Sequence, residues 1–138
     1  MNIVFEHRLR SDRAETRHLR LWVADFARRA QLPPPVWNAL DLALEECVTN
    51  VISHACDDGR EHWVTIRFKA DAKEVCVEVE DDGLEFNPLA LPPVDITEPL
   101  ETRAVGGLGV HMMRQLMDAV EYRRVNGRNV LSLIKRTA

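Results

Sequence analysis

The sequence predicts an α+β protein with two layers, a two-layer α/β sandwich in which a mixed, mostly antiparallel sheet carries its helices on one face. Three observations support this prediction. Short runs of alternating apolar and polar residues predict strands, longer segments repeat apolar residues at the helical period, and most strand runs form adjacent pairs joined by short turns. Adjacent pairs favour antiparallel neighbours, so the helices should pack together against one side of the sheet.

The first third of the chain predicts one strand followed by two helices. Residues 3–9 alternate in hydrophobicity and predict the strand. Ser11 is expected to cap a first helix, which ends before the prolines at 33–35. A second helix is expected over residues 35–56, because Asp57-Asp58-Gly59 is a turn signal.

Two alternating runs and a long irregular segment follow. Residues 64–68 and 75–79 carry valine, isoleucine and phenylalanine in phase, which predicts a hairpin turning at 71–73. Residues 84–105 contain four prolines and show no sustained period, so they predict a loop. Loops longer than about 12–15 residues are uncommon inside a domain and often cover a binding site. We therefore expect a mobile lid, and an insertion without a role is the alternative.

The end of the chain predicts a third helix and a second hairpin. The helix follows Gly106-Gly107-Leu108-Gly109, with apolar residues on one face over 110–117. Strand runs at 119–123 and 129–134 flank Asn126-Gly127, a strong hairpin turn signal.

Composition limits the class of protein. A chain of 138 residues predicts a single domain, 1–138, and 46% hydrophobic with 29% charged residues is ordinary for a globular protein. The net charge of -4 offers no broad basic surface, so nucleic acid is not an expected partner. There is no apolar run of roughly 20 residues for a membrane helix, and the start lacks the apolar core of a secretion signal. A cytoplasmic location is expected. The three cysteines lack CxxC spacing and suggest neither disulfides nor zinc.

A polar stripe lies along one edge of the second predicted helix. Glu46, Asn50 and His54 follow one another at i, i+4 beside the apolar face. Asparagine is a poor helix former, and half-buried polar groups need partners. The stripe therefore predicts a metal and nucleotide site, although His54 could also be a helix-end histidine with local hydrogen bonds.

Two further features could serve a ligand. Asp81 is in phase with the apolar residues of its strand, so its carboxylate should face inward and require N–H donors, such as an adenine amino group. A turn-capping aspartate is the alternative, and Asp82 suits that role better. Gly107-Leu108-Gly109 begins a helix, where backbone amides can face phosphate oxygens, although a simple loop-to-helix turn would look similar.

These segments, in this order, resemble those of the GHKL ATPase superfamily, and most closely those of the bacterial anti-sigma-factor serine/threonine kinases. The resemblance covers nearly the whole chain and rests on residues 45–55, 81–83, 107–109, 114–122 and 127–130. It implies the Bergerat fold of histidine-kinase-like ATPase domains, which bind ATP between helices and a sheet.

The resemblance also implies roles for residues of the second helix. Asn50 would ligate the Mg²⁺ that bridges the ATP phosphates, and His54 would lie near the nucleotide. Glu46 would be the catalytic base that accepts the proton of the attacking hydroxyl. Glu45 is the weaker candidate for this role, because it projects to the opposite flank of the helix.

The remaining contacts to ATP come from the strand end and the third helix. Asp81 would accept from the adenine amine, and Gly83 would let the base approach the backbone. Gly107, Leu108 and Gly109 would touch the phosphates through their amides. Two departures stand out: Val105 replaces a glycine that the family often has, and no threonine is evident in the late strand, so no residue is assigned to that contact.

The function implied is an ATP-dependent protein serine/threonine kinase that phosphorylates an anti-anti-sigma protein of the STAS type and regulates a sigma factor. A homodimer is left open. The first alternative is a module that binds ATP or ADP and sequesters its partner with little phosphoryl transfer. The second is a detached histidine-kinase domain, which is weaker because no helix with a phosphoacceptor histidine is evident.

Overall fold

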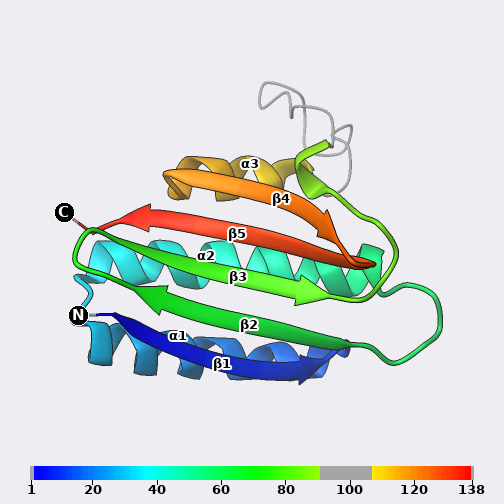
Figure 1. Cartoon of the computed structure of the whole chain (residues 1–138), viewed down its shortest axis with the longest axis horizontal. Coiled ribbons are helices and arrows are strands. Elements are labelled where there is room, and N and C mark those ends of the chain that lie inside the picture. Colours follow the sequence, from blue (N-terminus) through cyan, green and yellow to red (C-terminus); the bar gives the residue numbers. More distant parts are fainter. Residues whose placement is uncertain (1, 91–106, 138) are drawn as a thin grey trace.

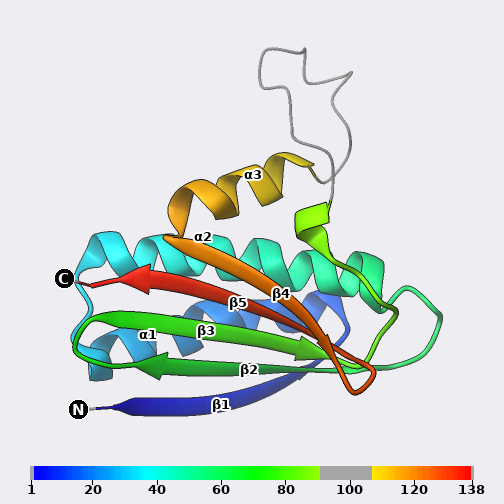
Figure 2. The same cartoon turned by 45° about the horizontal axis from the view of Figure 1, so that its top comes forward.

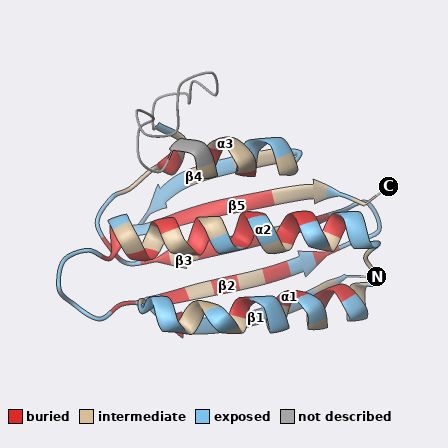
Figure 3. Cartoon of the chain, turned by 180° about the vertical axis from the view of Figure 1, so that it is seen from behind, coloured by how far each residue is buried: buried red, intermediate tan, exposed pale blue. Residues whose placement is uncertain are grey.

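A computed structural model describes residues 2–90 and 107–137 as one five-stranded sheet with helices on one of its faces (Figures 1 and 3). The strand order is β1-β2-β3-β5-β4, and every described pairing is antiparallel. The predicted two-layer α+β fold with a mostly antiparallel sheet is therefore confirmed.

The elements follow the predicted order. The strands are β1 (Ile3–Arg10), β2 (Trp63–Ala70), β3 (Glu74–Asp81), β4 (Ala119–Val125) and β5 (Arg128–Arg136). The α-helices are α1 (Arg17–Ala30), α2 (Pro34–Asn50) and α3 (Gly107–Leu116). Three short helical segments complete the fold: the 3-10 turns η1 (Arg13–Thr16) and η3 (Pro88–Ala90), and the π-helix η2 (Val51–Ala55).

The start of the first helical region differs from the prediction. Asp12, rather than Ser11, is the capping residue, and its side chain accepts a hydrogen bond from the Ala14 amide at 3.0 Å. The Ser11 hydroxyl instead accepts from the backbone amide of His62 at 3.0 Å. Both residue types can cap a helix. Because the Ser11 hydroxyl is bound to the backbone of His62, Asp12 provides the cap instead.

The second helix is central to the fold, because its apolar face packs under the sheet. Leu40, Leu44, Cys47 and Val48 are fully buried. The α-helix does not continue to residue 56 as predicted, because the last turn widens into the π-helix η2. Such π-turns are rare and occur frequently at functional sites.

The two faces of the sheet have different chemistry. The face toward the helices is largely buried (Figure 3), and most of its buried side chains are apolar. The other face carries ion pairs that cross the strands; for example, Lys69 and Arg123 both contact Glu78, at 2.7 Å and 3.1 Å. One buried face and one charged face are typical of an antiparallel sheet.

The second hairpin brings a late segment of the chain beside an early strand. Asn126 and Gly127 both have positive φ, 51° and 76°, as the two-residue turn between β4 and β5 requires. The second strand of this hairpin, β5, also pairs with β3 on its other side, so Asn129 lies directly opposite Asp81. In the described residues no helix is long and apolar enough to cross a membrane.

Only the start of the predicted lid lies in the described part. Residues 84–90 leave the end of β3 and rise past α2 toward the start of α3 (Figure 2). Residues 91–106, which include the rest of the lid and Val105, lie outside the described residues.

Candidate functional site

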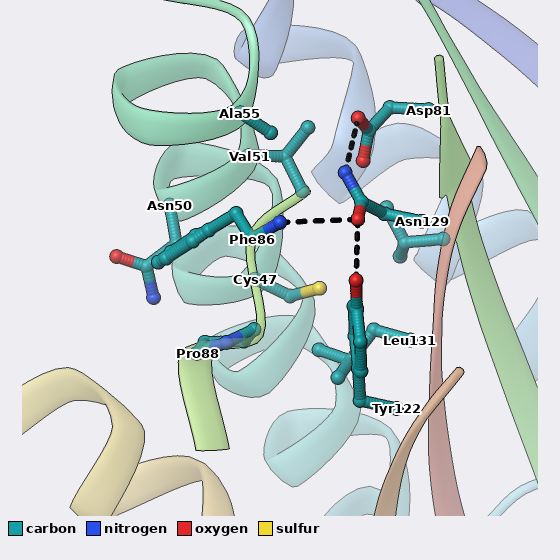
Figure 4. Close-up of a pocket in the computed structure, with 11 residues that line it drawn as sticks. Cys47, Asn50, Val51, Ala55, Asp81, Phe86, Pro88, Tyr122, Asn129 and Leu131 are labelled. Atoms are coloured by element: carbon teal, nitrogen blue, oxygen red, sulfur yellow. Dashed lines mark hydrogen bonds between the residues drawn. The ribbon is translucent and has the colours of Figure 1, made fainter. Parts of the chain in front are cut away.

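A small cavity lies between α2, the π-helix, and the ends of β3 and β5 (Figure 4). Most of the lining is apolar or aromatic, and the polar groups come from α2, β3 and β5. The lining residues are Cys47, Asn50, Val51, Ala55, Val79, Asp81, Phe86, Pro88, Tyr122, Asn129 and Leu131.

Asp81 supplies the acidic group of this cavity. Its side chain is only 2% exposed, which confirms that it faces inward. One oxygen, Oδ1, accepts from the Gly83 amide and from Asn129 Nδ2, each at 2.9 Å. The other oxygen, Oδ2, is buried and has no hydrogen-bond partner among residues 2–90 and 107–137. A buried acceptor without a donor is costly, so this atom is suited to a ligand that brings an N–H group.

Burial also changes the acidity of Asp81. Desolvation raises its pKa, and the hydrogen bonds from Asn129 and Gly83 oppose this rise. The negative charge of Asp82 raises the pKa further. The two hydrogen bonds therefore favour the ionised form of a carboxylate that burial would otherwise protonate.

Asn129 is a residue of the cavity that the sequence did not predict. Its Nδ2 atom donates to Asp81 Oδ1 and to the Leu84 carbonyl, the latter at 2.7 Å. Its Oδ1 atom accepts from the Tyr122 hydroxyl at 2.6 Å, from Arg124 Nη1 at 3.0 Å and from the Phe86 amide at 3.2 Å. An asparagine amide offers two donors and one acceptor oxygen, so its hydrogen-bonding capacity is fully used. Asn129 therefore fixes Asp81 and leaves only Oδ2 for a ligand.

Gly83 is needed for a close approach of two backbone segments. A Cβ atom at this position would overlap the carbonyl group of Ala55 in the π-helix. The next amide, that of Leu84, donates to the same Ala55 carbonyl at 2.7 Å. The glycine was predicted for the approach of a base, and the described contacts give it this separate structural reason.

Glu46 and Asn50 lie one turn apart on α2, as predicted. Asn50 is buried and lines the cavity, and its Nδ2 atom makes no hydrogen bond to any residue that the structure describes. Glu46 is half-buried, and desolvation raises its pKa, while the nearby Asn50 amide opposes the rise. Glu45, by contrast, is exposed. A carboxylate with a raised pKa is better matched to accepting a proton near neutral pH.

The first turn of α3 lies directly over Glu46. A Cβ atom at Gly109 would overlap the Glu46 carboxylate, so a larger residue here would displace that side chain. Gly107 and Leu108 begin the same helix. The structure thus brings the predicted glycine segment beside the predicted base, with the amino end of a helix facing it, where anions are favoured.

His54 differs most from its predicted position. Its side chain is exposed and does not line the cavity, although Asn50 one turn earlier does. The π-helix begins at Val51 and has more residues per turn, so α-helical phase does not extend from Asn50 to His54. The His54 ring packs instead against Phe86, with 4.7 Å between ring centroids.

Phe86 and Tyr122 add aromatic surface that sequence reasoning did not assign. Phe86 lies between Asn50 and Asn129 in Figure 4, and its backbone is bound to Asn129. Close by, Arg114 of α3 donates to the Leu89 carbonyl at 2.8 Å. The described start of the predicted lid is therefore attached both to β5 and to α3. A polar residue in the apolar run Asn129-Val130-Leu131 was the one signal for the hydrogen-bonding centre.

Comparison with known proteins identifies the class. The sequence profile of the histidine kinase-like ATPase domain matches residues 9–135, so the chain belongs to that family, within the GHKL superfamily. It is similar to the serine/threonine-protein kinase BtrW of Bordetella bronchiseptica, with 26% identity over 117 residues covering 85% of this chain and 82% of BtrW. It is also similar to the serine-protein kinase RsbW of Halalkalibacterium halodurans, with 31% identity over 113 residues covering 79% of this chain and 68% of RsbW.

A solved structure shows the same fold. The histidine kinase domain from the blue-light activated histidine kinase of Erythrobacter litoralis EL346 superposes with a TM-score of 0.60 at 16% identity. The superposition covers 88% of this chain, which spans 60% of the length of that structure. At this identity the likeness concerns the fold alone.

Proposed function

We propose that this protein is an ATP-dependent serine/threonine kinase that transfers the γ-phosphoryl group to a regulatory protein partner. One observation carries the proposal: the unpartnered Asp81 Oδ2 and the unpartnered Asn50 Nδ2 line the same cavity. Both atoms need a ligand with polar groups, and ATP, the ligand expected of a histidine kinase-like ATPase domain, has such groups. The named serine kinases among its relatives support the choice of acceptor.

The binding roles follow from the chemistry of each group. Asp81 Oδ2 would accept a hydrogen bond from the adenine amine, which is a donor that an ionised carboxylate can pair with. Phe86 and Tyr122 would pack against the base. The amides of Gly107, Leu108 and Gly109 would contact the phosphates, where backbone N–H groups and the helix dipole favour negative charge.

The residues of α2 fit a magnesium site in part. Asn50 offers a side-chain oxygen, and Mg²⁺ commonly takes one or two protein oxygens beside phosphate and water. Magnesium, when bound, would neutralise charge on the phosphates. With its oxygen on the metal, Asn50 would have its unpaired Nδ2 donor free for a hydrogen bond to a phosphate oxygen of the nucleotide.

Glu46 would act in the transfer itself. As the acceptor oxygen forms its bond to the γ-phosphorus, Glu46 takes the hydroxyl proton, and the bond between the γ-phosphorus and the β,γ-bridging oxygen breaks to release ADP. The raised pKa of Glu46 suits this role. His54 lies outside the cavity, so we assign it no more than a contact at the cavity mouth through Phe86.

We further propose that the partner is an anti-anti-sigma protein of the STAS type and that phosphorylation controls a sigma factor. The similarity to RsbW and BtrW supports this proposal. The competing function is a module that binds ATP or ADP and sequesters its partner without phosphoryl transfer.

The test combines the protein with labelled ATP, Mg²⁺ and the STAS-domain protein encoded nearest to it. Phosphoserine or phosphothreonine should appear on the partner, and Glu46→Gln should abolish it while nucleotide binding persists. Glu45→Gln is the matched control, because the exposed Glu45 should tolerate the same change. Nucleotide binding without any transfer would favour sequestration, and no nucleotide binding would refute both functions.

A further inference from the structure

A buried histidine lies on the far side of the Asp81–Gly83 turn from the cavity. His62, the residue before β2, is 8% exposed. Its Nδ1 atom is 2.8 Å from Asp82 Oδ1, and its Nε2 atom is 2.8 Å and 2.9 Å from the two oxygens of Asp58. Both ring nitrogens thus face carboxylates.

This geometry identifies the protonation state of His62. A neutral imidazole has one N–H group and could donate to only one carboxylate, and its other nitrogen would then face an acceptor. Both nitrogens donate to ionised carboxylates only when both carry protons, so the two contacts favour the imidazolium form. The hydrogen bonds that the ring donates to Asp58 and then to Asp82 raise the pKa of His62 accordingly.

Other charged groups near His62 are already engaged. Glu61 pairs with Arg10 at 3.0 Å, and the Arg60 amide donates to Asp58 at 3.0 Å. Burial raises the pKa of the Cys56 thiol, which is therefore neutral. Asp81 is turned toward the cavity and bound to Asn129. Asp58 and Asp82 are accordingly the two groups that set the charge on His62.

The histidine is itself firmly positioned. Its backbone amide donates to the Ser11 hydroxyl at 3.0 Å, and its carbonyl accepts from the Ser11 amide at 2.9 Å. The Asp81–Gly83 turn and the following Leu84 are consequently held from three directions: by Asn129 of β5, by the Ala55 carbonyl that accepts from the Leu84 amide, and by His62 through Asp82.

We propose that His62 is a positioning residue of the nucleotide site, which in its protonated form holds Asp82 and so maintains the Asp81–Gly83 turn in the shape that receives the base. This inference rests on the proposed nucleotide-binding function. Deprotonation removes one of the two donors. The loss leaves the Asp82 carboxylate, which is 61% exposed, without a cationic partner beside Asp81.

The first experiment measures ATP affinity by calorimetry from about pH 6 to about pH 10, a window that begins near the ordinary pKa of histidine. Wild-type affinity should fall by about threefold to tenfold as His62 loses its proton, as expected when one charge-assisted hydrogen bond beside the site is lost. His62→Gln should show the lower affinity throughout and no such transition. His18→Gln, a change in a half-buried histidine of α1, is the matched control and should retain the wild-type profile.

A second variant separates positioning from simple folding. Asp58→Asn keeps the Asp82 contact but removes the largest cause of the raised pKa, so the transition in ATP affinity should move to lower pH with the affinity below it unchanged. By linkage, ATP should raise the pKa of His62 followed by NMR, because the protonated form binds ATP more tightly.

The outcomes distinguish the two proposals. An ATP affinity independent of pH, or a transition that stays in place in Asp58→Asn, would overturn the role of His62 and leave nucleotide binding intact. A wild-type protein that binds no ATP at any pH would overturn the nucleotide site and this inference together.

Discussion

Asn129 lies opposite Asp81 in the β3–β5 pair and donates its amide to the Asp81 carboxylate at 2.9 Å. Residues separated by 48 positions in the chain thus form one unit at the base of the cavity. The pairing leaves Asp81 with a single free oxygen, Oδ2, which is the atom available to a ligand.

Asp81→Asn should weaken ATP binding at least about tenfold, because it places an amide where the adenine amine needs an acceptor. The same change removes a buried charge whose pKa is raised by desolvation, so the nucleotide-free protein should be as stable as wild type or more stable. Calorimetry for ATP and thermal unfolding without nucleotide test the two effects. Unchanged ATP affinity in the folded variant would refute the assignment of Asp81.

Asn129→Leu should lower the free energy of unfolding by about 2–4 kcal/mol, because it removes several buried hydrogen bonds and leaves their partners unsatisfied. Urea unfolding measures the loss. Tyr122→Phe is the matched control, since it removes one of these hydrogen bonds and should cost about 1 kcal/mol. Equal losses in the two variants would show that Asn129 is not the centre of the network.

Gly109→Ala should destabilise the protein and reduce phosphoryl transfer, because the new methyl group overlaps the Glu46 carboxylate. A double-mutant cycle with Glu46→Ala isolates this contact. In the Glu46→Ala background the same glycine substitution should cost little stability, since the overlapping side chain is gone. An identical cost in both backgrounds would place the clash elsewhere in α3.

The Asp58–His62–Asp82 cluster should make stability depend on pH. The folded-state pKa of His62 is raised, so its contribution is complete below the ordinary value of 6.5 and is lost as pH rises through the raised value. The pKa of Asp58 is lowered, so its contribution is complete above 3.8 and is lost as pH falls through the lowered value.

Urea unfolding at several pH values therefore should show the greatest difference between wild type and His62→Gln from about pH 3.8 to about pH 6.5, and a smaller difference at alkaline pH. A difference that grows with rising pH would contradict the assigned charge of His62.

Local patterns in the sequence were sufficient to predict the order of elements and part of the site. The inward direction of Asp81 followed from strand alternation, and the common edge of Glu46 and Asn50 followed from helical spacing. Both features depend on residues within a few positions of each other, where backbone geometry alone decides which side chains share a face.

The parts that were not predicted depend on distant contacts. Asn129 acquires its role only when β5 pairs with β3, and Ser11 loses the predicted cap because His62 approaches it. The exposed position of His54 did not follow from α-helical spacing, because its segment forms a π-helix. No local pattern indicates these partners, which lie tens of residues away in the chain.

The geometry of the site depends on the number of residues in the π-helix as well as on their identity. In an α-helix each residue turns by about 100°. Gaining or losing one residue between Asn50 and Cys56 would therefore rotate the Ala55 carbonyl away from Leu84, whose amide it now binds at 2.7 Å. Among related chains, a change of length here should accordingly separate Asn50, the proposed magnesium ligand, from Asp81, the proposed adenine acceptor, even where every side chain of the site is retained.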